Sequence, residues 1–442
     1  MKRFLAHVII EAKTPLKVGG GKNDLFLDAP VQRDWNGLPM ILGTSVAGIL
    51  RRAFEDLKGG DDKNEIFGMK DERDPNKQKG SRLIVSNALL VNEKGKVCEE
   101  LLLEKSRFLR YFDDLPIRDH VAISANGTAK DAGKFDEEVV FKGTRFKFSL
   151  ELDGSKEEFE RILNLLSDPA LRLGGGSSKG FGSLGILEIK WGEFELDRYS
   201  SSLNFSSDEF VKFMPDSAAD GNSARQKFIR YELKISPDDF FMFGSGFGDK
   251  DADQTPVLES VIDYENKCLG KRKILIPASS VKGALSHRTA FHFNKINKQF
   301  GEKAKVGSEN EAVREIFGYE KNKNEKGSKG KILISDCFLD YDEAKDTKVF
   351  EHVSIDRFTG GAIDSALFQE KAVAKRDKFI IEILLKNDAR DDTEKRAFKN
   401  VLEAFETALD DLVKGRLPLG GVTTKGYGFF KGEVIKTAID RS

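Results

Sequence analysis

The segments LGGGSSKGFG (173–182) and LGGVTTKGYG (419–428) share one order of glycines, hydroxyl residues, lysine and aromatic ring. They are the last of several pairs that recur in the same order along the chain. The other pairs are LGTSVAGIL (42–50) with PASSVKGAL (277–285), EIFG (65–68) with EIFG (315–318), RLIVSNALL (82–90) with KILISDCFL (331–339), HVAIS (120–124) with HVSID (352–356), and FDEEVVFKGTRFKFSLEL (135–152) with FQEKAVAKRDKFIIEILL (368–385). Ordered self-similarity over this length indicates that one domain is present twice.

The repeat sets the number of domains. A length of 442 residues alone favours about three domains, but the repeat predicts two. We expect a first domain over residues 1–195, a linker over 196–228 and a second domain over 229–442. The linker is rich in Ser, Asp and Gly and lacks sustained periodicity, which is typical of a connecting segment.

Each half predicts the same series of elements: strand, helix, strand, strand, helix, strand. In the first half these are strands near 4–10, 83 and 144–152, a helix capped by Thr44-Ser45, a helix over 156–166, and a strand after the glycine loop. In the second half they are strands near 231–235, 332 and 378–385, a helix capped by Ser279-Ser280, a helix over 392–412, and a strand after the glycine loop. This is the ferredoxin-like order, an α+β fold with both helices on one face of an antiparallel sheet. We expect the other face to be free for a ligand.

The two glycine loops suit a phosphodiester. Glycines let backbone N–H groups approach a ligand closely, while hydroxyls and an ammonium add donors and charge. The groups come from Gly174, Gly175, Ser177, Ser178 and Lys179, and from Gly420, Gly421, Thr423, Thr424 and Lys425. A Walker A loop is excluded, because there the lysine precedes a hydroxyl residue and a helix follows. The alternative is a glycine hairpin with a solvated lysine.

The predicted helix starts are a second candidate anion site, because free N–H groups at a helix N-terminus attract anions. The residues on or near them are Ser45, Arg51, Arg52, Ser279, Ser280, Lys282 and Arg288. Ordinary capping with surface bases is the alternative. The lysine-rich loops 71–82 and 321–331 are a third candidate, with solvated loops as the alternative.

Composition excludes several classes of protein. With 72 Lys+Arg against 73 Asp+Glu, the net charge of -1 gives no overall field that attracts polyanions, so any such ligand must be bound at local basic positions. Cys98, Cys268 and Cys337 form neither a disulfide framework nor a metal-ligand spacing. No stretch approaches the roughly 18 apolar residues that span a bilayer. We expect a cytoplasmic protein with no membrane partner.

Several motifs together resemble a known family. In order, TPLKVGGG (14–21), DAPVQRD (28–34), GLPMILGTS (37–45) and GGGSSKGFG (174–182) resemble the RAMP superfamily, specifically the backbone subunits of type III CRISPR effector complexes. In the second half, HVSIDRFTGGA (352–362) followed by LFQEKAV (367–373) is similar to that family's thumb hairpin. A tandem double subunit is similar to the fused backbone proteins of type III-D-like variants.

The resemblance implies two tandem ferredoxin-like (RRM-like) domains, each with inserted loops and a thumb β-hairpin. It implies a CRISPR RNA-binding backbone subunit whose partners are the CRISPR RNA, single-stranded target RNA and other effector subunits. Arg357 and Phe358 in the second thumb are then expected to contact RNA. The first-half segment HVAISANGTAKDAG (120–133) lacks the Ile-Asp-Arg-x-Thr-Gly core, although Asn126-Gly127 favours a hairpin turn.

The resemblance further implies metal-dependent cleavage of guide-paired target RNA, which would make the protein an endoribonuclease subunit. The matching catalytic and metal-binding residue is Asp28, whose carboxylate would recruit Mg²⁺ or another divalent cation or position the attacking 2′-hydroxyl. A turn cap before Pro30 is the alternative. Asp253 is the second-half candidate, in a longer loop where Asp251 competes for the role.

The equivalent His120 and His352 predict a structural or base-stacking role rather than acid–base catalysis. Three other functions stay open at this level. One is a pure guide-RNA scaffold in which both aspartates are structural. Another is a stand-alone guide-processing endoribonuclease, for which His7 lies in a strand where burial is expected. The last is a nucleotide-binding enzyme, disfavoured because no Walker or dinucleotide motif is present.

Overall fold

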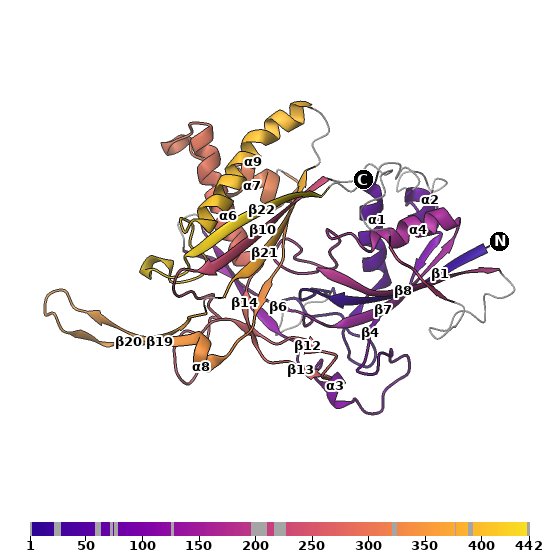
Figure 1. Ribbon diagram of the computed structural model, residues 1–442, viewed down its shortest axis with the longest axis horizontal. Helices are drawn as coiled ribbons and strands as arrows, with labels where there is room; N and C mark the ends of the chain where they lie inside the picture. Colours follow the sequence, from indigo (N-terminus) through magenta and orange to yellow (C-terminus); the bar gives the residue numbers. More distant parts are fainter. Residues whose placement is uncertain are drawn as a thin grey trace.

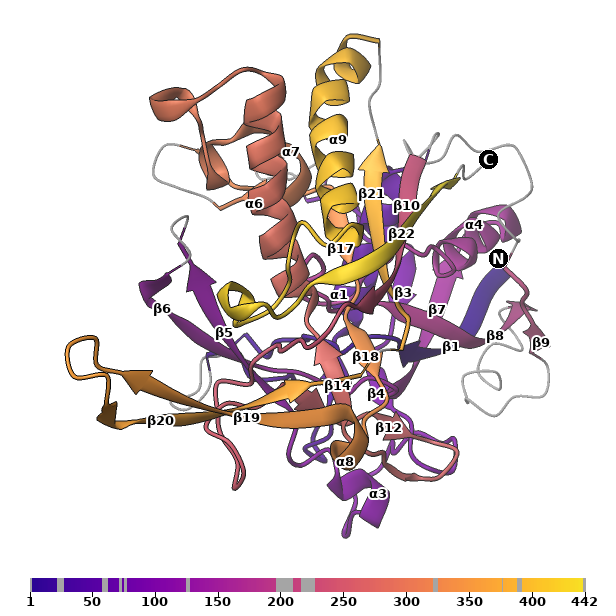
Figure 2. The same ribbon diagram turned by 60° about the vertical axis from the view of Figure 1, so that its left-hand side comes forward.

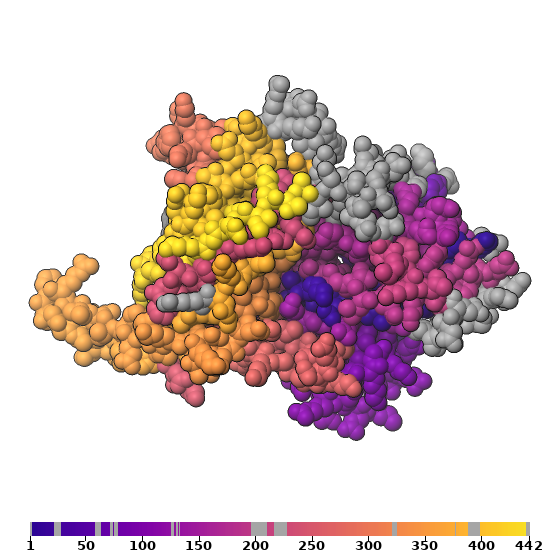
Figure 3. Space-filling view, in the orientation of Figure 1, coloured from indigo at the N-terminus to yellow at the C-terminus, as the bar shows by residue number. Residues whose placement is uncertain are grey.

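The computed structural model describes residues 2–21, 28–57, 63–70, 74, 78–124, 128–195, 210–215, 227–320, 325–375, 377–387 and 392–439. The two halves lie side by side, with the first half at the right and the second at the left of Figure 1. In the space-filling view they lie directly against each other (Figure 3). Most of the predicted linker, residues 196–209 and 216–226, lies outside the described residues, as do Asn126-Gly127 and residues 71–73, 75–77 and 321–324 of the lysine-rich loops.

The first half has the predicted ferredoxin-like core. Its elements are β1 (Lys2–Ala12), α1 (Gly43–Glu55), β3 (Leu83–Val85), β7 (Arg145–Asp153), α4 (Lys156–Leu165) and β8 (Leu184–Glu195). Antiparallel pairing places them in the order β3-β7-β1-β8. The short strands β2 (Met40–Ile41), β4 (Ala88–Leu90) and β9 (Val211–Lys212) extend this sheet.

The second half repeats this core. Its elements are β10 (Lys227–Pro237), α6 (Ala278–Ile296), β17 (Ile332–Ile334), β21 (Phe379–Asn387), α9 (Asp392–Val413) and β22 (Phe430–Ile439). Their order, β17-β21-β10-β22, is that of the first sheet, and the pairing is again antiparallel. The predicted tandem α+β fold is therefore confirmed.

Local sequence explains these elements. In β7 buried residues alternate with partly exposed ones, so that Phe146, Phe148, Leu150 and Leu152 face one core. Helix α4 begins with a capping box in which Ser155 and Glu158 bond each other's backbone N–H groups. Its apolar stripe packs on the same side of the sheet as α1.

The predicted N-caps are wrong. Helix α1 begins after Leu42 and α6 after Pro277, so Thr44-Ser45 and Ser279-Ser280 lie inside the first turns. The caps come from further along the chain. Asn87 Oδ1 accepts from the Gly43 N–H at 2.9 Å, and Asp336 Oδ1 accepts from the Ala278 N–H at 2.8 Å. These two capping residues are equivalent in the repeat, each following a short core strand, and only the tertiary fold brings them to the helix starts.

The expectation of free sheet faces is also wrong in part. In the first half, His7 on the face opposite the helices is buried against Phe210, with ring centroids 4.6 Å apart. The burial expected of His7 is thus confirmed. In the second half, Phe228, Leu333 and Leu384 on the corresponding face pack against Ala170 of the first half. Neighbouring segments cover these faces because their apolar residues need burial.

The second half also contributes to the first core. Strands β12 (Ile262–Asp263) and β13 (Cys268–Leu269) form a small hairpin beside the first half. Ile262 belongs to the first hydrophobic core, and its N–H donates to the Lys142 carbonyl at 2.9 Å. The Tyr264 hydroxyl donates to the Val91 carbonyl at 2.6 Å. The two halves are therefore interlocked rather than merely adjacent.

Both halves carry a thumb hairpin. The first comprises β5 (Ile117–Ile123) and β6 (Ala129–Glu138), and the second β19 (Thr347–Ile355) and β20 (Ala362–Val373). Each has a register irregularity at the same place, after Val121 and after Val353. Figure 2 shows both hairpins extending from the same side of the molecule. The hairpin expected in the first half is therefore present although its core motif differs.

The remaining elements are short, and the longest is a seven-residue helix of the second half, α7 (Glu311–Phe317). They are α2 (Lys63–Phe67), α3 (Arg107–Arg110), β11 (Leu258–Glu259), β14 (Lys273–Ile276), α7 (Glu311–Phe317), β15 (Gly318–Tyr319), β16 (Ser328–Lys329), β18 (Cys337–Leu339), α8 (Glu343–Asp346) and the 3₁₀ turns at Gly301–Lys303, Gly307–Glu309 and Thr423–Lys425. Helix α7 packs with α6 and α9 on one side of the second sheet (Figure 1).

A buried ion-pair triad joins the halves. Arg118 on β5 donates to Glu259 Oε2 at 2.8 Å and to Asp336 Oδ2 at 2.6 Å, both in the second half. The three side chains are 7% exposed or less. Burial opposes the charge on Arg118, but the Asp336 and Glu259 carboxylates raise its pKa above the ordinary value. The guanidinium stays charged and pairs with both carboxylates, while burial raises the pKa of Glu259.

Replacing Arg118 by Met should destabilise the protein by about 3–5 kcal/mol, because two buried carboxylates lose their partner. Urea unfolding measures this free energy. Arg110→Met is the matched control, since its pair with Glu104 is exposed and contributes about 0–1 kcal/mol. Equal free energies of unfolding for the two variants would contradict the role of the triad.

Candidate nucleic-acid interface

The two glycine loops have the same backbone geometry. Gly174 and Gly420 have φ values of +83° and +94°, and a Cβ there would lie 2.2 and 2.4 Å from the carbonyl oxygens of Lys17 and Met242. The next residues, Gly175 and Gly421, donate their N–H groups to those same carbonyls at 2.8 and 2.7 Å. Only glycine fits the first position, and Lys17 and Met242 occupy equivalent places in the two halves.

The first loop reaches across to the second half. Gly180 lies so close to the Asp336 carboxylate that a Cβ would come within 2.0 Å of Oδ1. Lys282, in the first turns of α6, donates to Ser178 Oγ at 3.1 Å. Burial lowers the pKa of Lys282, and the neighbouring Lys179 ammonium lowers it further. We call this group the bridging site; it comprises Ser178, Lys179 and Lys282, and the neighbouring Ser177 is buried.

The bridging site suits an anion. Two ammonium groups from different halves lie close enough to affect each other, next to the Ser178 hydroxyl and the start of a long helix. A phosphate placed between them would relieve the repulsion of like charges and accept hydrogen bonds. The structure thus brings one predicted loop and one predicted helix start together, although each was predicted as a separate site.

The second loop has no such neighbour. A Cβ at Gly426, the counterpart of Gly180, would meet no described atom within 4 Å. Thr424 and Lys425 are exposed. Gly420, Gly421 and Thr423 belong to the same loop, which packs against Met242 of its own half. Among the described residues, this loop therefore has the hydroxyl groups and the lysine of a glycine loop but lacks a neighbouring helix start with a second lysine such as Lys282.

The other basic candidates are elsewhere. Ser45 is exposed in the first turn of α1, and Arg51 donates to Asn64. Arg52 lies near Lys329 of the second half. Burial lowers the pKa of Lys329, and the positive charges of Arg52, Arg172 and Lys386 lower it further. A second basic cluster thus spans the two halves. Arg288 is held by Asp411 at 2.6 Å inside the second half.

Behind each glycine loop lies a repeated ring stack that sequence reasoning identified only in part. His120 stacks on Phe135 and His352 on Phe368, both with centroids 5.0 Å apart. The loop lysines lie over the same rings, Lys179 at 4.9 Å from Phe135 and Lys425 at 4.6 Å from Phe368. Both histidines therefore stack on a ring of their own hairpin, in line with the structural role expected for them.

Each stack covers a buried glutamate. Glu137 is 4% and Glu370 1% exposed. His120 Nε2 lies 3.5 Å from Glu137, and His352 Nε2 lies 3.0 Å from Glu370. Burial opposes the charge of Glu137, yet His120, Lys17 and the more distant Lys179 lower its pKa to about 2. A repeated Phe-x-Glu, at 135–137 and 368–370, was the available sequence signal for these residues.

The two candidate aspartates have matching positions on the thumbs. Asp28 Oδ2 accepts from the Asp136 N–H of β6 at 3.2 Å, and Asp136 Oδ1 accepts from the Asp28 N–H at 3.0 Å. Asp253 Oδ2 accepts from the Gln369 N–H of β20 at 2.8 Å. Since Asp136 and Gln369 are equivalent in the repeat, Asp253 is the structural counterpart of Asp28.

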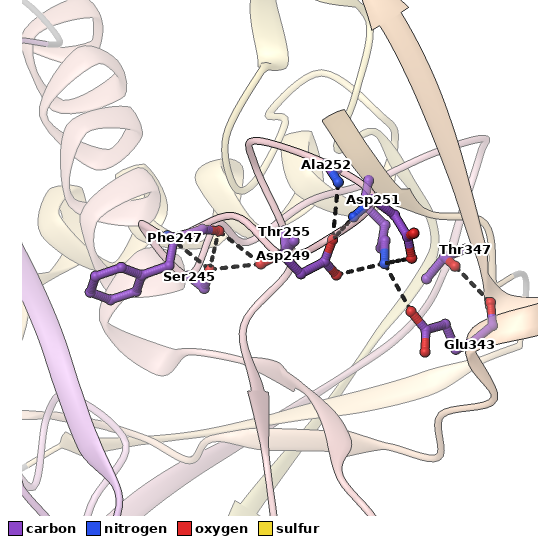
Figure 4. Close-up of polar contacts among 9 residues, drawn as sticks. Ser245, Phe247, Asp249, Asp251, Ala252, Thr255, Glu343 and Thr347 are labelled. Atoms are coloured by element: carbon purple, nitrogen blue, oxygen red, sulfur yellow. Dashed lines mark hydrogen bonds and ion pairs between the residues drawn. The ribbon is translucent and has the colours of Figure 1, made fainter. Parts of the chain in front are cut away.

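The Asp251 alternative belongs to a different cluster. Asp249, Asp251 and Glu343 converge from the loop before β11 and from α8 (Figure 4). The Lys371 ammonium already lies among them, 2.6 Å from Asp249, 2.8 Å from Glu343 and 3.4 Å from Asp251. Burial opposes its charge, but Asp249 and Glu343 raise the pKa of Lys371 above the ordinary value. An amine therefore already occupies the space between these carboxylates.

The second thumb ends in an exposed aromatic residue. Phe358 is 99% exposed at the hairpin tip, and Arg357 beside it is also exposed. The turn is ordered by Asp356, which accepts from the N–H groups of Phe358 and Thr359 at 2.9 and 2.7 Å. These residues lie on the hairpin and not in the glycine loops, so they form a separate part of any interface.

Val422 is a strained residue in the second loop. Its φ of +58° is rare for a β-branched side chain and corresponds to Gly176, with φ +68°, in the first loop. Val422→Gly should therefore stabilise the protein by up to about 1 kcal/mol, the relief of strain less the entropy cost of glycine. Thermal unfolding measures the change.

The reverse substitution is the matched control. Gly176→Val should destabilise, because a Cβ there would lie 2.4 Å from the Phe181 ring in addition to the backbone strain. A loss of stability in Val422→Gly would show that the loop is held in this conformation by contacts of the valine side chain.

Comparison with known protein families agrees with the repeat of one fold in the two halves. None of the helices in the described part of the chain is long and apolar enough to cross a membrane. No curated protein matches the chain at a significant level. The model of the RAMP superfamily matches residues 9–185 and 269–431, one region in each half. The chain is therefore a tandem member of the RAMP superfamily, a CRISPR-associated RNA-binding protein.

Proposed function

We propose that this chain is a double backbone subunit of a type III CRISPR effector complex that binds guide RNA and cleaves the target RNA paired with it. The observation that carries the proposal is the bridging site, where Lys179 and Lys282 come from different halves and lie beside Ser178. A site of two amines and a hydroxyl fits a phosphodiester. It recognises no base, as expected of a protein whose target is read by guide pairing.

The duplicated geometry supports a repeating ligand. Two glycine loops with one backbone conformation, and two thumbs extending from one side of the molecule (Figure 2), match two successive segments of a nucleic-acid backbone. The exposed Phe358 can insert between bases, since aromatic side chains stack on any base. The alternative of a stand-alone processing enzyme is disfavoured because His7 is buried.

The second loop supports a protein partner. In the first loop Gly180 lies against Asp336, whereas in the second loop the space beside the equivalent Gly426 is open. A further subunit can place the start of a helix in that space and repeat the contact that the two halves make within this chain. Head-to-tail association of this kind does not close on itself and extends along a linear ligand. Other effector subunits are therefore the proposed partners.

Cleavage is proposed at Asp28. Asp28 and Asp136 place two carboxylates side by side, each with one oxygen outside their reciprocal hydrogen bonds. Such a pair fits Mg²⁺, which proteins bind through one or two carboxylates and substrate phosphate oxygens. The ion would stabilise charge on the reacting phosphate. In the second half the pair is Asp253 with Gln369, which leaves a single carboxylate.

Lysine substitutions test RNA binding. Lys179→Met and Lys282→Met should each weaken binding of single-stranded RNA and reduce the slope of log K against log salt by about 0.7. Lys414→Met is the control, since Lys414 pairs with Asp410 on α9 and should leave the slope unchanged. Equal slopes for all three variants would refute the bridging site as an RNA contact.

Aspartate substitutions test cleavage. In the assembled complex, Asp28→Asn should abolish metal-dependent cutting at one position of the target, and Asp136→Asn should slow the same cut. Chelation of divalent cations should stop it in the unaltered protein. Guide binding should persist in both variants. Cutting that survives in Asp28→Asn and Asp253→Asn alike would assign this chain a scaffold role only.

A further inference from the structure

The two buried glutamates are neutralised by different lysines. In the first half the Lys17 ammonium binds Glu137, while Lys179 lies over Phe135 and forms no ion pair within the described part of the chain. In the second half the Lys425 ammonium itself binds Glu370 at 2.7 Å. The equivalent glycine-loop lysines therefore have different partners although loop, ring stack and glutamate are the same.

A single residue accounts for the difference. The carbonyls of Lys17 and Met242 accept the same hydrogen bond from the equivalent Gly175 and Gly421, so the two residues occupy one position of the repeat. Met242 is 2% exposed and offers no charge. With no amine at this position, the amine that pairs with Glu370 is that of the glycine loop.

The pairing has an energetic reason. A carboxylate that is 1% exposed is strongly destabilised unless a cation lies next to it. Lys425 supplies that cation from a side chain that is 43% exposed, so its ammonium lies between solvent and the buried acid. A phosphate that binds Lys425 must compete with Glu370, whereas behind Lys179 the buried Glu137 is already paired with Lys17.

We propose that Glu370 restrains Lys425, and that the residue at position 17 or 242 decides which glycine loop binds RNA phosphate strongly. In the first half Lys17 pairs with Glu137, so that Lys179 is available for a phosphate. In the second half Met242 has no charge, so that Lys425 pairs with Glu370. The inference rests on the proposed RNA-binding function for its consequence, but the restraint itself is a property of the protein without RNA. Guide RNA then engages the bridging site more tightly than the second loop.

Lysine acylation measures the restraint without RNA. The rate of acetylation at each lysine is followed by mass spectrometry in the full chain. Glu370→Gln should raise the rate at Lys425 several-fold and leave Lys179 unchanged. Glu137→Gln, which makes the same change behind the first loop, should raise the rate at Lys17 and not at Lys425. An unchanged rate at Lys425 in folded Glu370→Gln overturns the proposal.

A reciprocal variant covers the case in which Glu370→Gln does not fold. Lys17 is partly exposed, and Lys17→Met gives the first half the arrangement of the second. Glu137 should then draw in Lys179, which already lies within its electrostatic reach. Acetylation at Lys179 should slow several-fold, and RNA affinity should fall. A rate at Lys179 that stays the same contradicts the proposal.

RNA binding measures the consequence. For a single-stranded polyuridine probe, Glu370→Gln should tighten binding and steepen the salt slope by about 0.7. Asp410→Asn changes the net charge equally and releases Lys414, the residue after α9, so it should leave both unchanged. If Glu370→Gln speeds acetylation of Lys425 but no variant binds RNA, the proposed function is refuted and the pairing of Lys425 with Glu370 stands. RNA binding that Glu370→Gln does not alter would refute the inference and keep the function.

Discussion

The Asp336 carboxylate is the contact on which the arrangement of the two halves depends. One oxygen caps α6 through the Ala278 N–H, the other binds the buried guanidinium of Arg118, and the Gly180 loop lies against both. Because the side chain is fully buried, the Ala278 N–H and the Arg118 guanidinium are needed to compensate its charge. The same carboxylate that starts a helix in one half therefore fixes a thumb and a glycine loop of the other, and the bridging site follows from that geometry.

Duplication has conserved this architecture but not its charges. Glu138 and Lys371 occupy the same position at the base of the two thumbs. Glu138 binds Arg33 and the Val31 N–H, whereas Lys371 binds Asp249, Asp251 and Glu343. Each fixes the loop that carries Asp28 or Asp253. Residues of opposite charge hold equivalent loops because each loop carries side chains of the complementary charge. In the same way, Lys17 and Lys425 pair with equivalent glutamates because the residues around them differ between the halves.

Much of the fold could be predicted from local patterns. The repeat, the strand periodicity and the apolar stripes of α4 and α9 predicted two ferredoxin-like domains, and the thumbs followed from the resemblance. The helix caps could not be predicted, because Asn87 and Asp336 lie far along the chain from Gly43 and Ala278. The covered sheet faces were missed because the covering residues, Phe210 and Ala170, come from outside each predicted core.

The sequence by itself determined that one RNA-binding module occurs twice and which residue types it carries, since these depend on order, spacing and composition. Tertiary structure alone decided that Lys179 and Lys282 share a site, that Asp253 rather than Asp251 corresponds to Asp28, and that Lys425 is paired with Glu370. The physical reason is that electrostatic pairing acts through space. Which charges neutralise one another is settled only when distant segments are packed together and water is excluded from between them.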